Sequence, residues 1–126
     1  MRNLIKTLLL LLMLSFSHAA IAGDVEDGLA AAKKGDFATA LRLWKPLAEQ
    51  GNARAQNNLG FMYANGDGVA QDYVKALTWW NIAAIDGVAD AIKNRDIVAK
   101  NIPPAQIEKA QEAANRCIKQ NFKNCD

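Results

Sequence analysis

The 126-residue chain contains very few of the side chains on which most catalytic and metal sites depend. Its single histidine is His18, and its only serines are Ser15 and Ser17. Histidine is the commonest general base and a frequent metal ligand, while serine is a common nucleophile. If the N-terminal segment is removed, as argued below, the remaining chain has neither residue type. We therefore expect no enzymatic activity, no cofactor and no bound metal.

The chain also lacks a strong excess of one charge and an apolar run long enough to cross a membrane. Fifteen Lys and Arg residues face thirteen Asp and Glu residues, and two of the cations, Arg2 and Lys6, lie in the N-terminal segment. A neutral domain without a basic stripe binds nucleic acid poorly. The longest apolar run, residues 8–14, is shorter than the roughly 18–20 residues that a bilayer requires. We expect no nucleic-acid partner and no integral membrane span.

The first 22 residues have the pattern of a signal peptide. Two cations near the start precede the apolar run at residues 8–14, and Ala20-x-Ala22 is a small-x-small cleavage site. We predict a signal peptide at residues 1–22 and a single mature domain at 23–126. A retained membrane anchor is the competing interpretation. The pattern predicts export, to the periplasm or as a secreted product.

Only two cysteines are present, Cys117 and Cys125. An even count in an exported chain favours a disulfide, because that compartment is oxidising. Such a bond would fix the tail to the last helix. A redox or metal-binding pair is the alternative, although seven intervening residues do not resemble C-x-x-C and two ligands alone make a weak zinc site.

The dominant pattern is a repeat with an offset of 36 residues. The paired positions are Asp36/Asp72, Phe37/Tyr73, Ala40/Ala76, Leu41/Leu77, Trp44/Trp80, Ala48/Ala84, Gly51/Gly87, Ala53/Ala89 and Ala55/Ala91. A period between 20 and 50 residues is typical of stacked helical hairpins. Trp44 and Trp80 therefore occupy core positions, which argues against their use as a sugar-stacking platform.

Helical spacing and stop signals predict five to six helices and no strand, so the fold class is an all-α repeat solenoid of αα-hairpins. Asp36, Asn52 and Asp72 are predicted N-caps, and Gly35, Gly51 and Gly87 are predicted stops. The expected helices cover residues 24–34, 37–50, 53–65, 73–86, 88–100 and 105–122.

Residues 51–87 resemble a complete Sel1-like repeat of the tetratricopeptide-like superfamily, in its small exported bacterial type. The matching positions are Ala53, Ala55, Leu59, Gly60, Tyr63, Gly66, Gly68, Val69, Asp72, Lys75, Ala76, Trp79, Ala83, Ala84 and Gly87. Residues 24–50 look like a compact first repeat, because Gly28 lies eight residues before its aspartate and Gly60 lies twelve. Residues 88–126 depart further and are interpreted as a C-terminal capping hairpin and tail.

The resemblance implies a concave face lined by the first helix of each hairpin. Apolar side chains among polar ones on that face would suit a protein partner, because a few buried anchors carry most binding energy. The alternative is that the apolar members pack within the domain and leave only a solvated polar face. The predicted partner-binding residues are Glu26, Leu29, Arg54, Asn57, Asn58, Phe61, Lys93, Asn94 and Ile97.

The function that these patterns favour is a non-catalytic protein–protein interaction module or adaptor of the periplasm. A narrower alternative, also implied by the resemblance, is an immunity or inhibitor protein that neutralises an effector. The alternative of another class is a cell-wall or glycan-related hydrolase or binder. Catalysis would then depend on threonine or carboxylates, and glycan binding would require exposed Trp or Tyr side chains.

Overall fold

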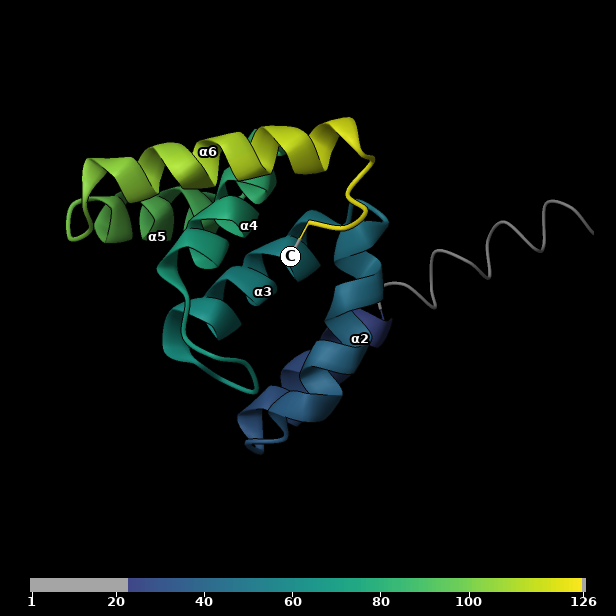
Figure 1. Ribbon diagram of the computed structural model, residues 1–126. Coiled ribbons are helices and arrows are strands. Elements are labelled where there is room, and N and C mark those ends of the chain that lie inside the picture. Colours follow the sequence, from purple (N-terminus) through teal and green to yellow (C-terminus); the bar gives the residue numbers. More distant parts are fainter. Residues whose placement is uncertain (1–22, 126) are drawn as a thin grey trace, which may run out of the picture.

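The computed structural model describes residues 23–125, and all regular structure within them is helical (Figure 1). Residues 23–33 form a helix, called helix 23–33 below. It is followed by α2 (Phe37–Glu49), α3 (Ala53–Asn65), α4 (Tyr73–Ile85), α5 (Ala89–Ala99) and α6 (Pro104–Lys119). The prediction of an all-α fold with five to six helices is confirmed for this part of the chain. The predicted signal peptide and Asp126 lie outside the described residues.

The predicted N-caps explain where three of the helices begin. The side-chain oxygens of Asp36, Asn52 and Asp72 each accept a hydrogen bond from the backbone N–H three residues later, at 3.0–3.2 Å. Hydrogen bonding with Thr39 holds the pKa of the Asp36 carboxyl below its ordinary value. The charged cap therefore stabilises the fold at neutral pH, and this contribution is lost as the pH falls through the lowered pKa.

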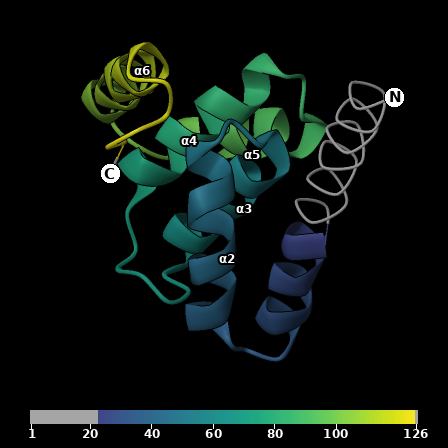
Figure 2. The same cartoon turned by 90° about the vertical axis from the view of Figure 1, so that its right-hand side faces the viewer.

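Helix α4 is the centre of the domain and packs against α3, α5 and α6 (Figures 1 and 2). Its buried residues surround the helix instead of forming one stripe, because neighbours cover it on several sides. Trp79 and Trp80 are only 1% and 2% exposed, and Trp44 of α2 is 3% exposed. The prediction that the tryptophans belong to the core is confirmed.

In the first repeat, a tryptophan of α2 lies directly over a glycine of the preceding helix. The indole Nε1 of Trp44 donates a hydrogen bond to the carbonyl oxygen of Val25 at 3.1 Å. A Cβ atom at Gly28 would overlap the same indole ring. The absence of a side chain at Gly28 therefore lets the ring approach the backbone closely enough for this buried hydrogen bond.

The second repeat reproduces this arrangement. Trp80 Nε1 donates to the carbonyl oxygen of Asn57 at 3.2 Å, and a Cβ atom at Gly60 would overlap the indole. In both repeats the accepting carbonyl belongs to the residue three positions before the glycine. The two repeats therefore share one tertiary contact although the loop between glycine and tryptophan differs in length by four residues. We call this contact the Gly–Trp interlock.

The longer loop of the second repeat folds back onto the first repeat. Gly66 ends α3 in the left-handed conformation, with φ of 72°. A Cβ atom at Gly68 would lie 2.9 Å from the Cβ of Phe37, so its backbone is in close contact with the start of α2. The Gln71 side chain donates to the carbonyl oxygen of Ala64 at 2.8 Å and closes the loop. These contacts place the loop beside the pocket described below.

The C-terminal tail is fixed by the predicted disulfide between Cys117 and Cys125, whose Cα atoms are 4.9 Å apart. The last helix was predicted to reach residue 122, which is wrong: α6 ends at Lys119. Asn121 and Phe122 adopt positive φ angles of 53° and 64°, which no α-helix accommodates. The chain turns back there, and the Phe122 ring lies against Gly51 at the α2–α3 turn.

Candidate functional site: an apolar pocket between the first helices of two hairpins

The candidate site is a pocket of about 290 Å³ between helix 23–33, α2 and α3. Most of its walls are apolar, two asparagines contribute amide groups, and Asp67 is the only charged residue among those that line it. The lining residues are Leu29, Ala32, Phe37, Trp44, Asn58, Phe61, Met62, Asn65 and Asp67. Helix 23–33 and α3 are the first helices of successive hairpins, so the pocket lies at the junction of two hairpins.

Phe61 is the most accessible large apolar side chain that lines this pocket, with 37% of its surface exposed. Its ring packs edge-on against Trp80, with ring centroids 5.6 Å apart. Trp80 is itself held by the interlock with Gly60. The orientation of Phe61 at the pocket is therefore fixed by the core of the second repeat. Leu29, from helix 23–33, is half-buried on the same pocket.

Glu26 and Arg54 connect the same two helices at the surface. The Arg54 guanidinium donates to a Glu26 carboxylate oxygen at 2.7 Å, and both side chains are about 60% exposed. An ion pair this exposed contributes between 0 and about 1 kcal/mol to stability. Both charged groups are therefore accessible to a partner, and a partner that breaks the pair would cost the domain little stability.

The two predicted asparagines of α3 have different environments. Asn58 is half-buried and lines the pocket. Asn57 is only 8% exposed, and its side-chain Oδ1 has no hydrogen-bond partner in residues 23–125. The sequence pattern placed Asn57 on the partner-binding surface and did not indicate that it would be buried. Because Asn57 also supplies the carbonyl that accepts the Trp80 hydrogen bond, we assign it to the helix interface and omit it from the proposed surface.

The predicted residues of α5 do not line this pocket. Lys93 is exposed, Ile97 is 48% exposed, and the Asn94 amide donates to the carbonyl oxygen of Asp90 one turn earlier at 2.7 Å. The structure therefore groups Glu26, Leu29, Arg54, Asn58 and Phe61 around one junction and leaves the α5 residues separate.

Exposed aromatic rings that could stack on a sugar are scarce in the described part of the chain. All three tryptophans are buried and Tyr63 is 8% exposed, as expected. The repeat pattern placed Tyr73 with the core, but this residue is 41% exposed because it is the first residue of α4. Its hydroxyl accepts a hydrogen bond from the Gln71 side chain at 3.1 Å. Residues 23–125 also form no helix long and apolar enough to cross a membrane.

Sequence reasoning missed the pocket residues that do not belong to the exposed face of a first helix. Phe37 and Trp44 come from α2, and Asp67 comes from the α3–α4 loop. The greater length of that loop in the second repeat was visible as the four-residue difference between the repeats, but its position against Phe37 depends on tertiary packing at Gly68.

Comparison with known protein families agrees with this geometry. The Sel1 repeat model matches residues 17–52 and 53–88, which together make up more than half of the chain. The matches have the 36-residue period of the pattern, and each contains one Gly–Trp interlock. The first match begins before residue 24, where we placed the start of the compact repeat. Sel1 repeats are typically protein-interaction modules and usually non-catalytic. With both repeats matched and their hairpins stacked, the chain belongs to the Sel1 repeat family.

Proposed function

We propose that this protein is a non-catalytic interaction module that binds a partner protein at the pocket beside Phe61. The observation that carries the proposal is the accessible apolar pocket between helix 23–33 and α3. The partly exposed Phe61 ring in this pocket is held in place by its packing against the buried Trp80. Burying one large apolar side chain of a partner there would contribute about 1.5–3 kcal/mol. The exposed Glu26–Arg54 pair on the same two helices supplies polar contacts near this anchor.

The charge of the pocket narrows the chemistry of the partner. Asp67 is the single acidic or basic residue among the lining residues, and it forms no ion pair with another side chain of residues 23–125. A partner segment with a Lys or Arg beside its apolar anchor would complement this carboxylate. The amides of Asn58 and Asn65 can bond to the backbone of such a segment. We therefore propose that an apolar residue next to a basic residue forms the recognised motif.

We expect Phe61→Asp to abolish binding while the helices stay folded, because the new carboxylate would meet an apolar anchor beside Asp67. Ile85→Asp is the matched control, since Ile85 is 67% exposed and lines none of the pockets described here. A displayed peptide library selected on the wild-type protein identifies ligands. Calorimetric titration of the enriched peptides then compares both variants, with circular dichroism to verify helicity.

The proposal requires three results from this experiment. The enriched peptides pair an apolar with a basic residue, Ile85→Asp binds them as the wild type does, and Asp67→Lys removes the preference for the basic residue. Equal affinity of Phe61→Asp and wild type for every enriched peptide would place recognition elsewhere on the molecule.

We also propose that the chain acts after export, in the periplasm or as a secreted protein. The signal-peptide pattern and the Cys117–Cys125 disulfide support this location, because disulfides persist in oxidising compartments. We expect the protein recovered from a periplasmic extract to begin at Gly23. Intact-mass measurement checks this, with Ala20→Arg/Ala22→Arg as a variant that should remain uncleaved. Recovery of the full 126-residue mass from the periplasm would contradict the predicted cleavage.

A further inference from the structure

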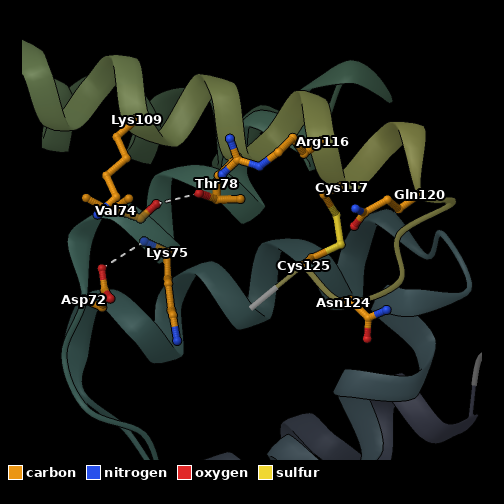
Figure 3. A pocket seen from close by; sticks show the side chains of 11 residues that line it. Asp72, Val74, Lys75, Thr78, Lys109, Arg116, Cys117, Gln120, Asn124 and Cys125 are labelled. Carbon is orange, nitrogen blue, oxygen red and sulfur yellow. Dashed lines mark hydrogen bonds between the residues drawn. A yellow bond between two sulfur atoms is a disulfide. The ribbon is translucent and has the colours of Figure 1, made fainter.

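A second pocket, of about 380 Å³, lies between α4, α6 and the disulfide-linked tail (Figure 3). Its walls carry three cationic side chains, Lys75 of α4 and Lys109 and Arg116 of α6, and one carboxylate, that of Asp72. This pocket shares no lining residue with the pocket at Phe61. Because the two charge signs balance in residues 23–126, the surplus of positive charge is a local property of this pocket.

Glu112 of α6 lies within one helical turn of both α6 cations that line the pocket. Neither Lys109 nor Arg116 forms an ion pair with another side chain of residues 23–125. Figure 3 shows both side chains extending from α6 toward α4. Asp72 is engaged as the N-cap of α4, and the Lys75 ammonium group lies 5.4 Å from the centre of the Tyr63 ring.

The dipoles of the two helices explain only part of this charge pattern. Arg116 lies in the last turn of α6, where the exposed carbonyls favour a cation. Lys109 lies in the first half of α6, remote from that end. Lys75 lies in the first turn of α4, where the helix dipole disfavours a cation. Lys75 is accounted for by its position over the Tyr63 ring, and its side chain extends away from α6 in Figure 3. Only the placement of Lys109 beside Arg116 therefore needs another explanation.

The two α6 cations indicate the charge of a ligand. Positions 109 and 116 are seven residues apart, which places them on one face of the helix and about 10.5 Å apart along its axis. The long side chains can bring the two charges closer together than their backbones. Two cations without an ion pair favour a ligand with two anionic groups over one small anion. Side-chain amides of Gln120 and Asn124 also line the pocket and can donate hydrogen bonds.

We propose that this pocket binds a small organic dianion, with one carboxylate or phosphate group at Arg116 and the other at Lys109. The guanidinium suits this task because it can bind such a group through two parallel hydrogen bonds. The volume falls within the range of small-molecule sites. This inference does not depend on the proposed protein partner, because the two pockets are separate.

Titration of the purified protein with linear dicarboxylates of increasing length, from succinate to suberate, tests the proposal by two-dimensional ¹⁵N NMR. Acetate is the single-charge probe, and alkanediol bisphosphates of matched length distinguish phosphate from carboxylate. We expect saturable shifts confined to α4, α6 and the tail. The best-fitting dianion should bind at least about tenfold more tightly than acetate, because its second anionic group adds its own contact.

Arg116→Gln and Lys109→Gln should each weaken binding of that dianion about tenfold, because each removes one charge-assisted contact. Lys119→Gln is the matched control, since Lys119 is an exposed cation of the same helix that does not line the pocket. Thermal melting verifies that all three variants fold. Equal binding by the three variants, or affinity that does not exceed that of acetate at any chain length, would overturn the proposal.

Discussion

Gly60→Ala is expected to lower the free energy of unfolding by about 3 kcal/mol. The added methyl group overpacks the core, and the buried indole N–H of Trp80 loses its hydrogen-bond acceptor. The new Cβ atom would overlap the pyrrole ring of Trp80, so the indole must move away. That movement breaks the 3.2 Å hydrogen bond to the carbonyl oxygen of Asn57. For a domain of this size the melting temperature should fall by about 12–24 °C, which thermal denaturation followed by circular dichroism measures.

Gly35→Ala is the matched control for this experiment. Gly35 has φ of 79° and no atom within 4 Å of a built Cβ, so alanine there adds backbone strain without a clash. We expect a loss of about 1–2 kcal/mol at that position. A double-mutant cycle with Trp80→Phe isolates the interlock, since the smaller ring should reduce the Gly60→Ala penalty by about 1 kcal/mol or more. A Gly60→Ala variant as stable as Gly35→Ala would contradict the interlock.

Reduction of the Cys117–Cys125 disulfide is expected to lower the free energy of unfolding by about 2–3 kcal/mol, because it releases a short closed loop in the unfolded chain. The tail should also leave the α2–α3 turn, since residues 121 and 122 adopt positive φ while Phe122 contacts Gly51. We expect the melting temperature to fall by about 10–20 °C. Hydrogen exchange at Gly51 should become faster at the same time.

A Cys117→Ala/Cys125→Ala variant separates the effect of the bond from other effects of the reductant. We expect this variant to melt near the temperature of the reduced wild type and to be insensitive to further reductant. Thiol titration verifies complete reduction of the wild type. An unchanged melting temperature after complete reduction would mean that the tail stays docked through packing alone.

The helices themselves were predictable because their signals are local. Asp36, Asn52 and Asp72 cap their helices in the structure as the sequence indicated. The period of 36 residues likewise predicted stacked hairpins, since each hairpin needs a neighbour to bury its apolar face. The end of α6 was predicted wrongly, because the disulfide-linked tail imposes positive φ at residues that otherwise continue a helical pattern.

The candidate site was predictable only in part. The exposed face of the first helices indicated Leu29 and Phe61, which do line one pocket. Burial of Asn57, and the contribution of Phe37 and Asp67, depend on how α2 and the α3–α4 loop pack against α3. A repeat pattern gives the position of a residue within its hairpin, but the adjoining hairpin decides whether that residue is covered.

The sequence by itself determined the helical hairpins, their caps and the family, since hydrogen bonding and apolar periodicity act over a few residues. Only the tertiary structure decided which glycine each tryptophan covers, because that contact joins residues 16 positions apart in one repeat and 20 in the other. It also decided that Lys109 and Arg116 of α6 line one pocket together with residues of α4. Those contacts form when separate helices pack, and they position both pockets.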